Sequence, residues 1–518
     1  MSSGEQKPGN TSDKVRQACE YCRSRKIRCN NLNPCPNCQR INIPCLYQVP
    51  KKKGPRRREA IQEIPRSIPR EREFVNTVSS IPSADSFQPS PLLSLEIFQS
   101  CLNIFFTNKY PVMPILDRET IYASLHELHH SPTQYSLITS ICAVIMMQTA
   151  MSLPIDREGF LDTSQQFDSV LTVDFFIKET YRAREFFDQV ESPSLASVQT
   201  SFFLFFSLSQ RGKDNSAWLH LRESITMLQL LNLHEEDSYT TMTDSCYATL
   251  SRRTFWLLFI TEQAYALQRH LPLTLRRPIR LPIVADDQEA TIIYGFLDSV
   301  NLFRNFGDGF MALWNSTERD HTRLVSPRPF IKLQESLKDA IPNVRDRSEV
   351  QQADLLITRQ WLKMIVWQLC LKKGMLSSNP IIDSMSFHYP IDIARDVTLV
   401  TRLLPLEAFQ ANGVGILGKI FDIGCSLADV LLVHPHILHR STVEIGPKDY
   451  LMDMVRILDM DIQGHAKYLV LLANRADECL GVRVPRPLSS GNGSPAVCEI
   501  DWDEGSDEIY DSASSSPY

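Results

Sequence analysis

Apolar residues recur at helical spacing through the long central part of the chain, from about residue 92 to residue 480. One stripe runs from Trp218 to Leu231 and another from Leu417 to Leu431, with apolar positions three and four residues apart. Glycine is scarce there, with twelve residues, or about 3% against a usual 7%. No Asn-Gly turn separates two alternating strands. The pattern predicts a large all-α domain over residues 92–480.

Two stretches within this domain are mostly apolar, residues 137–151 and 202–208. A helix needs about 20 consecutive apolar residues to span a bilayer, and both stretches are too short or too polar. We therefore expect both to be buried core helices, and we expect no association with a membrane.

The regions around this domain have a different composition. Residues 1–16 are polar, and residues 481–518 form an acidic tail, so both are expected to be disordered. Residues 48–91 are expected to form a disordered linker that is first basic and then rich in serine and proline. Five prolines fall between residues 59 and 91. Because one proline inside a helix costs about 3 kcal/mol, we expect no coiled-coil dimerisation helix in the linker.

Six of the thirteen cysteines lie within 27 residues, with the spacing C-x2-C-x6-C-x5-C-x2-C-x6-C. The set is Cys19, Cys22, Cys29, Cys35, Cys38 and Cys45. Such density is also found in disulfide-bonded secreted domains, but the polar N-terminal residues lack the apolar run of a signal peptide. Zinc is favoured, because thiolates are preferred ligands of tetrahedral structural zinc sites.

The two halves of this segment look like an internal duplication. Two tetrahedral zinc ions need eight ligand positions, and six thiolates supply them if two sulfurs bridge both metals. The symmetric choice of bridges is the first cysteine of each half, Cys19 and Cys35. The remaining ligands of the first zinc are then Cys22 and Cys29, and those of the second are Cys38 and Cys45. The sequence therefore predicts two Zn2+ as cofactors.

These residues resemble the fungal binuclear zinc-cluster (Zn2Cys6) transcription factors. The resemblance covers residues 17–47, including the segments Cys-Arg-Ser-Arg-Lys-Ile-Arg-Cys and Asn-Pro-Cys-Pro-Asn-Cys. It departs at Asn30-Asn31, where Asp-Gly is common, although asparagine tolerates the left-handed backbone angles of a turn. The resemblance implies a small zinc-cluster DNA-binding domain at 17–47, followed by a large regulatory domain.

Basic side chains cluster between the second and third cysteines, and the pattern predicts that a short helix carries them. By resemblance, Arg25 and Lys26 fall where the family reads a CGG-type triplet, since Arg and Lys pair with the acceptor edge of guanine in the major groove. Arg23 and Arg28 are expected to hold phosphates. Arg40, in the second half, completes the predicted DNA-binding set.

The charge of the chain is divided unevenly. The net charge is −6, but residues 14–58 carry +12, so the remainder carries −18. One segment is thus suited to nucleic acid while the rest is not. The linker begins with a basic run that suits nuclear import or phosphate contact, consisting of Lys51, Lys52, Lys53, Arg56, Arg57 and Arg58. We expect double-stranded DNA as a partner and the nucleus as the location.

Two stretches of the large domain, residues 105–116 and 252–259, resemble the fungal-specific regulatory domain that accompanies zinc clusters. The closing segments 447–451 and 464–469 are similar to starch and maltose regulators of filamentous fungi, while related regulators switch secondary-metabolite gene clusters. The usual Gly-Arg-Pro after the second stretch is replaced by Arg269-His270-Leu271-Pro272, so the resemblance implies no detailed structure for that loop.

Two motifs typical of enzymes occur in the chain, and both have simpler interpretations. Residues 126–130 match H-E-x-x-H, but Pro132 ends the segment almost at once, and histidines at a helix end are the simpler interpretation. Residues 413–418 match G-x-G-x-x-G, a fingerprint that has meaning only between a strand and a helix. The preceding residues read as helix, so a tight helix–helix connection is expected.

The acidic tail interleaves seven acids at 499–511 with Ile500, Trp502, Ile509 and Tyr510. This pattern is consistent with an activation segment or with a solubilising tail. The sequence as a whole predicts a sequence-specific transcription factor and not an enzyme. It is more readily an activator than a ligand-gated repressor, with co-regulators and a small-molecule inducer as further partners. Carbohydrate-use control and secondary-metabolite control both remain open.

Overall fold

A computed structural model describes residues 18–30, 32–47, 86–147, 171–276, 278–284, 289–316, 326–378, 380–434, 445–459 and 466–481. The chain forms two compact units, residues 1–78 and 79–518. Several predicted regions lie outside the described residues: the disordered N-terminus, the basic run, the part of the proline-containing linker up to residue 85, and the acidic tail from residue 482.

The described part of the first unit is built around cysteine. It contains two helices of five residues each, α1 (Glu20–Ser24) and α2 (Pro36–Arg40). Its fully buried cluster consists of five of the six clustered cysteines, against which a few half-buried side chains pack. Within the described residues, this unit therefore has no apolar core of the ordinary kind.

The second unit is helical, as the sequence predicts. Among its described residues the only β pairing is an isolated bridge between Ser377 and Ser386. The longer helices of its first half are α3 (Leu95–Ile104), α5 (Pro132–Met146), α7 (Val173–Arg184), α8 (Leu195–Gln210), α9 (Asp214–Leu230) and α11 (Ser245–Arg269). Those of its second half are α12 (Ala290–Phe303), α14 (Arg328–Asp339), α15 (Glu349–Lys372), α16 (Tyr389–Leu403), α18 (Val414–Val433), α19 (Pro447–Asp459) and α20 (Ala466–Leu480).

Shorter elements connect these helices. They are a π-helical turn at Phe105–Lys109, α4 (Arg118–Ser124), 3-10 turns at Leu125–Glu127, Val344–Asp346 and Asp383–Met385, α10 (Glu236–Thr241), α13 (Asp308–Trp314) and α17 (Leu406–Asn412). Many helices begin where a side-chain oxygen accepts a hydrogen bond from the first turn, which is the usual N-cap arrangement. Ser194 caps α8, Asp244 caps α11 and Ser348 caps α15 in this way.

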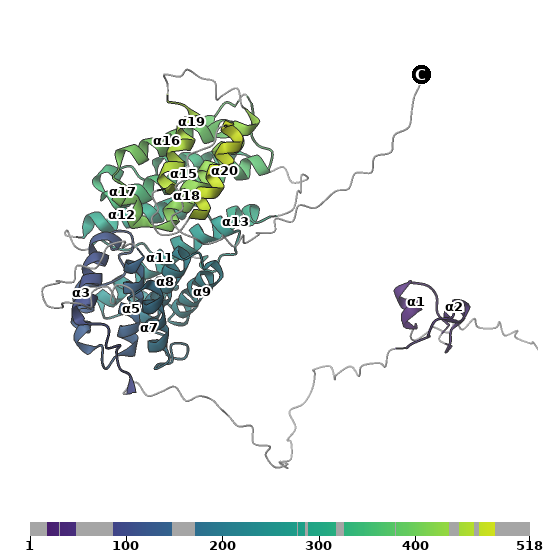
Figure 1. Cartoon of the computed structure of the whole chain (residues 1–518), viewed down its shortest axis with the longest axis horizontal. Helices are drawn as coiled ribbons and strands as arrows, with labels where there is room; N and C mark the ends of the chain where they lie inside the picture. Colours follow the sequence, from purple (N-terminus) through teal and green to yellow (C-terminus); the bar gives the residue numbers. More distant parts are fainter. Residues whose placement is uncertain are drawn as a thin grey trace, which may run out of the picture. The chain divides into compact units, whose positions relative to one another are not determined.

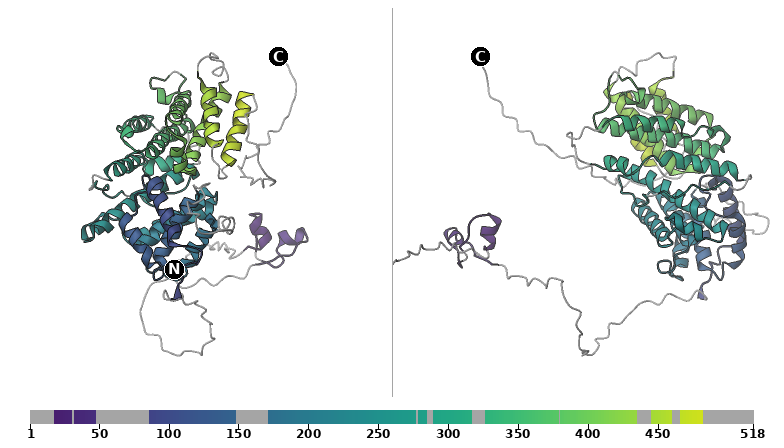
Figure 2. Two further views of the ribbon diagram at one scale, coloured as in Figure 1. Left: turned by 60° about the vertical axis from the view of Figure 1, so that its left-hand side comes forward. Right: turned by 180° about the vertical axis from the view of Figure 1, so that it is seen from behind.

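Two hydrophobic cores lie within this helical unit. The first includes buried side chains from Phe87 to Val300, and the second includes those from Ala266 to Ala476. Figure 1 shows the corresponding groups of helices, with α3 to α9 in one group and α15 to α20 in the other, and both views of Figure 2 keep the two groups distinct.

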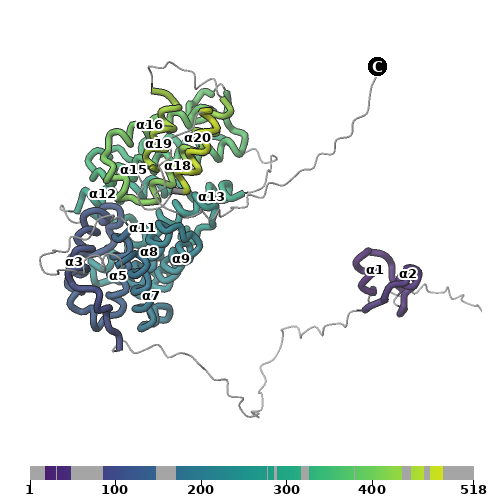
Figure 3. The backbone as a smooth tube through the Cα atoms, viewed as in Figure 1, coloured from purple at the N-terminus to yellow at the C-terminus, as the bar shows by residue number. Residues whose placement is uncertain are grey.

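Helix α11 belongs to both cores. Phe255 and Leu258 are buried in the first core, Ala266 and Leu267 are buried in the second, and Ile260 packs against both. The trace in Figure 3 follows the chain from the first group of helices through α11 and α12 into the second. The helical unit is therefore two cores joined through shared helices.

The predicted helical stripes are confirmed. Leu221, Ile225 and Leu228 are fully buried on α9, and Leu427 and Leu431 are fully buried on α18. The apolar runs form α5 and α8, whose side chains are largely buried, although residues 148–151 lie outside the described residues. No helix among the described residues is long and apolar enough to cross a membrane.

The folded region begins earlier than the predicted boundary at residue 92. Phe87, placed in the linker from the sequence, is only 3% exposed, and its ring packs edge-on against Tyr135 and Phe186. A single aromatic residue among serines and prolines shows no periodicity, so the sequence pattern could not reveal its burial.

Candidate metal centre and nucleic-acid interface

The zinc-cluster segment repeats its backbone after sixteen residues. Cys19 and Cys35 are extended residues that precede α1 and α2, with φ and ψ of −62° and 160° and of −75° and 153°. Lys26 and Asn42, seven residues after these cysteines, both have positive φ, at 52° and 50°. The internal duplication expected from the spacing is thus present in the backbone.

Equivalent hydrogen bonds hold the two halves. The amide of Ile27 donates to the carbonyl of Cys22 at 3.0 Å, and the amide of Ile43 donates to the carbonyl of Cys38 at 3.2 Å. Each bond folds the chain back after its short helix. The third cysteine of each half, Cys29 or Cys45, is thereby returned to the sulfurs of the first two.

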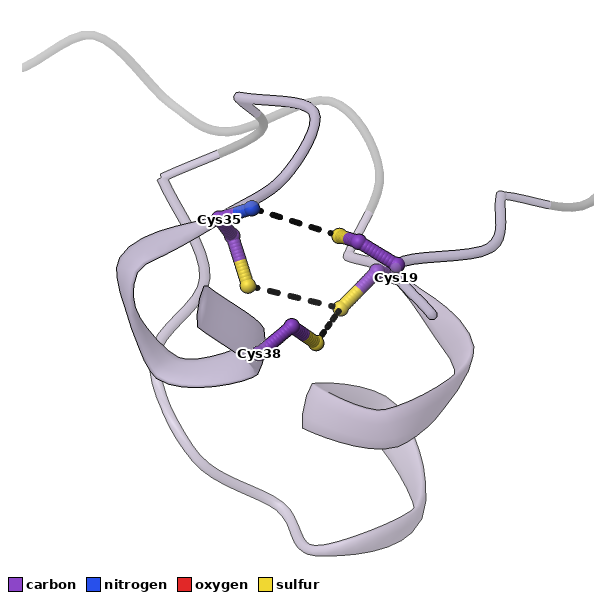
Figure 4. Close-up of side chains that lie close together, drawn as sticks. Cys19, Cys35 and Cys38 are labelled. Atoms are coloured by element: carbon purple, nitrogen blue, oxygen red, sulfur yellow. Dashed lines mark hydrogen bonds between the residues drawn. The ribbon is translucent and has the colours of Figure 1, made fainter. Parts of the chain in front are cut away.

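The six sulfurs fall into two overlapping groups of four. One group contains Cys19, Cys22, Cys29 and Cys35, the other contains Cys19, Cys35, Cys38 and Cys45, and within each group the sulfurs lie within 4.8 Å of one another. The groups share Cys19 and Cys35, the two cysteines predicted as bridges. Figure 4 shows the side chains of Cys19, Cys35 and Cys38 converging, with Cys19 Sγ lying 3.7 Å from Cys35 Sγ and 3.6 Å from Cys38 Sγ.

This donor set fits two zinc ions. Four sulfurs arranged tetrahedrally at about 2.3 Å from a zinc ion are separated from one another by about 3.8 Å. The closest sulfur pairs here, including Cys22 and Cys35 at 3.6 Å, come near that separation. Two tetrahedra that share an edge account for all six cysteines.

The cysteines differ in how readily they ionise. The pKa of Cys35 is lowered to about 6, chiefly because the backbone amide of Cys38 donates to its sulfur. The pKa of Cys38 is raised to about 12, chiefly by burial. Crowded sulfurs cannot all carry a negative charge unless cations are present. The site is therefore electrostatically complete only with its metals.

Hydrogen bonds from Tyr47 and Asn37, which the cysteine spacing does not predict, stabilise the cluster. The Tyr47 hydroxyl donates to the Leu32 carbonyl at 2.9 Å and lies 3.5 Å from Cys29 Sγ. The Asn37 side chain donates to the Arg28 carbonyl at 2.9 Å and to Cys22 Sγ at 3.7 Å. Both residues lie inside the predicted domain, but nothing in the cysteine spacing identifies their partners.

The expectation that one short helix carries the basic residues is only partly right. Helix α1 ends at Ser24, so it includes Arg23 but not Lys26 or Arg28. The chain must turn back toward the cysteines after α1, and the positive φ of Lys26 belongs to that turn. Arg25, at the end of the helix, places its guanidinium 5.9 Å from the centre of the Tyr21 ring.

The two halves differ in charge. Arg23, Arg25, Lys26, Arg28 and Arg40 are all exposed. The positions sixteen residues after the first four are held by uncharged residues, namely Gln39, Ile41, Asn42 and Pro44. Arg40 is thus the single basic residue in the described second half, and the positive surface lies mainly around the first half.

The structure shows in which elements the two motifs typical of enzymes lie. His126 lies in a 3-10 turn, not in a zinc-binding helix. In the residues described, the two cysteine groups are the only gatherings of three or more potential metal ligands. Gly413 connects α17 directly to α18 with φ at 67°, which confirms a tight helix–helix connection.

Comparison with known proteins agrees with this architecture. Residues 17–54 match the fungal Zn(2)-Cys(6) binuclear cluster domain, which binds two zinc ions, and residues 102–303 match the fungal specific transcription factor domain.

Several relatives match most of the chain. It is 26% identical to a probable sucrose utilization protein of Candida albicans over 83% of this chain and 80% of that protein. It is 23% identical to a maltose fermentation regulatory protein of Saccharomyces cerevisiae over 82% of this chain and 85% of that protein.

A third relative matches a shorter part. This is an azaphilone cluster-specific transcription factor of Aspergillus niger, 25% identical over 54% of this chain and 64% of that protein. The zinc cluster, the helical unit and these matches together show that the chain joins a binuclear zinc-cluster domain to a fungal specific transcription factor domain, and that its relatives are fungal Zn2Cys6 transcription factors.

Proposed function

We propose that this DNA-binding transcription factor is a nuclear activator of genes for carbohydrate use, and that it is not an enzyme. The observation that carries the proposal is the exposed basic surface on one half of the six-cysteine cluster. Such a surface supplies phosphate contacts and base-reading groups from one rigid module.

The proposed ligands of the metals are the six clustered cysteines, with Cys19 and Cys35 bridging both zinc ions. Their overlap in two groups of four supports this assignment. Both proposed bridges stand immediately before a short helix, so the backbone holds them in equivalent positions. The metals in turn fix the path of the chain between Cys22 and Cys29.

Lys26 and Arg25 are the proposed readers of a CGG-like triplet. Lys26 lies beyond the end of α1 in the turn, and both side chains are exposed. Arg23, Arg28 and Arg40 are the proposed phosphate contacts. The run from Lys51 to Arg58 is proposed to add further phosphate contacts and to direct nuclear import.

Control of carbohydrate use is favoured because the relatives with sucrose and maltose in their names match along about four-fifths of both chains. A secondary-metabolite gene cluster is the second candidate, favoured by the shorter match to the azaphilone regulator. In both cases the helical unit would relay a signal from co-regulators or from a small-molecule inducer. Mapped promoter occupancy distinguishes the two candidates.

The central test is selection of random DNA duplexes by the full chain, with and without a zinc chelator. We expect a CGG-containing consensus that disappears on chelation. Lys26→Ala should relax the preference for the triplet, since a good base contact is worth about 1–3 kcal/mol of discrimination.

Arg23→Ala is the matched control for the base-reading assignment. It should weaken binding to all sequences similarly and reduce the salt slope by about 1. An unchanged base preference in Lys26→Ala would remove that residue from the reading set. If the zinc-loaded chain enriched no sequence at all, specific DNA reading by the module would be refuted.

Activation is tested separately from DNA binding. Deletion of residues 499–518 should lower reporter output while leaving promoter occupancy unchanged. Unaltered output after that deletion would instead support a ligand-gated repressor.

A further inference from the structure

A cavity of about 200 Å3, partly open to solvent, lies among helices α8, α11, α18 and α20 of the helical unit. Its walls come from both cores. Phe202 and Leu257 belong to the first, Tyr468 packs against the second, and Ile260 packs against both. Engineered apolar cavities of about 150 Å3 bind benzene. The space therefore accommodates one six-membered ring with substituents.

Aromatic side chains give the cavity flat apolar surfaces. Phe205 and Tyr265 pack edge to face, with ring centres 5.5 Å apart, and Tyr265 also stacks on Trp218 at 5.7 Å. Tyr468 lines the wall from α20 and packs against Phe421 with ring centres 5.0 Å apart. Neighbouring rings restrict the rotation of these two tyrosines, so a ring-shaped ligand meets surfaces that are already formed.

The charged groups of the lining are paired with one another. Asp214, at the start of α9, lies 2.8 Å from Arg269 on α11 and 3.8 Å from Lys467 on α20. Lys419 on α18 lies 3.1 Å from Asp354 on α15. An ionic ligand would compete with these pairs, whereas hydroxyl groups can both donate to the carboxylates and accept from the cations.

On α18, Gly415 lines the cavity, and Gly418 lies against Gln268 and Tyr468, two residues of its wall. A Cβ atom at Gly418 would lie 3.1 Å from the Gln268 amide nitrogen and 3.6 Å from the Tyr468 hydroxyl, so the missing side chain leaves room for these two polar groups. A Cβ atom at Gly415, which lines the same cavity, would meet nothing within 4 Å. Gly415 therefore faces open space.

We propose that this cavity binds one ring of a neutral carbohydrate, either a monosaccharide or the terminal ring of a disaccharide. Aromatic surfaces contact the C–H faces of the ring, and the paired charges with Gln268 serve its hydroxyls. The bound ring contacts α8 and α11 on one side and α18 and α20 on the other, so it links the two cores. Its role as the inducer rests on the proposed function in carbohydrate use.

The test is calorimetric titration of the full chain with D-glucose and with maltose. We expect saturable binding of at least one of these sugars at one site per chain. Gly415→Leu should weaken binding at least tenfold, because the new side chain occupies the cavity. Gly418→Ala should weaken it about threefold by displacing Gln268.

Gly309→Leu is the matched control. Gly309 is the second residue of α13, as Gly415 is the second residue of α18, and a Cβ atom there also meets nothing within 4 Å. The sugar affinity of the Gly309→Leu variant should stay within twofold of that of the parent protein. Unfolding curves of all three variants establish that they fold, and Gly418→Ala decides the test if Gly415→Leu does not.

Three results would overturn the proposal. They are the absence of saturable heat with both sugars, full binding by a folded Gly415→Leu variant, and tighter binding of glucose 6-phosphate or toluene than of the better-binding of the two sugars. Binding of the same preparations to the selected DNA duplex is measured alongside. If DNA binding persists while sugar binding fails, the cavity assignment falls and the proposed DNA-binding function stands.

Discussion

In the zinc module the buried cluster is made of cysteine sulfurs, whereas in the helical unit it is made of aliphatic and aromatic side chains in two cores. The described residues of the module include ten helical ones, in α1 and α2. Its large apolar side chains Leu32 and Leu46 are 62% and 60% exposed. Apolar burial cannot stabilise such a module, so metal binding supplies its folding free energy.

This contrast teaches that the two units respond to different perturbations. Structural zinc contributes about 10–16 kcal/mol of apparent binding free energy in zinc-finger peptides. A helical domain is stabilised by many small burial terms, of which a single large side chain supplies a few kcal/mol. Each unit can therefore be disrupted while the other is left folded.

Removal of zinc gives the largest expected effect. A strong chelator should lower DNA affinity more than a hundredfold, because the module unfolds once its sulfurs lose their metals. The far-UV circular dichroism signal should fall by only a few per cent, since nearly all helical residues in the described part of the chain lie in the other unit. Cooperative loss of the whole helical signal would show that the two units are not independent.

Substitution of single cysteines distinguishes bridging from non-bridging zinc ligands within the module. Cys19→Ala and Cys35→Ala should each remove both zinc ions, because each of these sulfurs belongs to both groups of four. Cys22→Ala should leave one zinc bound. Zinc content measured by native mass spectrometry distinguishes these outcomes, and equal loss in all three variants would argue against the assignment of bridges.

Trp361→Ala removes a large buried side chain from the second hydrophobic core. Trp361 is fully buried on α15, and its indole N–H donates to Asp422 Oδ2 at 3.0 Å. Truncation of a buried tryptophan costs about 3–5 kcal/mol, so the urea midpoint of the helical unit should fall while zinc content stays constant. Leu403→Ala is the control, because Leu403 is 80% exposed and the change should stay within about 0.5 kcal/mol.

Asp422 makes the stability of the helical unit depend on pH. Burial raises its pKa to about 7 from a usual 3.8, although the Trp361 N–H, Arg269 and Gln268 favour the ionised form. The folded state thus holds this proton more tightly than the unfolded state does. The associated stability is complete below about pH 4 and is lost as the pH rises to about 7.

Asp422→Asn should remove this pH-dependent term, which is worth roughly 2–4 kcal/mol at pH 7. Urea unfolding at pH 5 and at pH 7.5 measures it as the difference between parent and variant. Asp429→Asn on the same helix is the control, because the Asp429 carboxylate is half-exposed and paired with Arg475. This change should leave the pH dependence of the free energy of unfolding nearly unchanged. If the free energy of unfolding changed with pH equally in the parent and in Asp422→Asn, the pH dependence would come from a group other than Asp422.

The sequence was most informative where chemistry restricts the residue types. The cysteine spacing predicted the overlap of two sulfur groups, because only shared sulfurs reconcile six ligands with two tetrahedral metals. The stripe from Trp218 to Leu231 likewise predicted α9, since a helix must bury one face. In both cases the relevant neighbours are close along the chain.

Contacts between distant residues could not be predicted. Lys109 is fully buried with its ammonium donating to the carbonyl of Ala411, three hundred residues away, and burial lowers its pKa to about 7. The cavity likewise draws its walls from helices spread between α8 and α20. Periodicity reveals which face of a helix is buried, but it does not reveal which other helix covers that face.

The repeat of the zinc module has one more consequence, which concerns direction. The halves share a backbone, yet Arg25 and Lys26 in one correspond to Ile41 and Asn42 in the other. Rotating the module so that its halves change places would leave the backbone nearly unchanged, but it would put a nearly neutral surface where the cationic surface was. The module is therefore asymmetric in charge, and DNA binds it in one orientation only. Two modules bound to neighbouring triplets would consequently form different complexes on inverted, everted and direct repeats, even without contacts between the proteins.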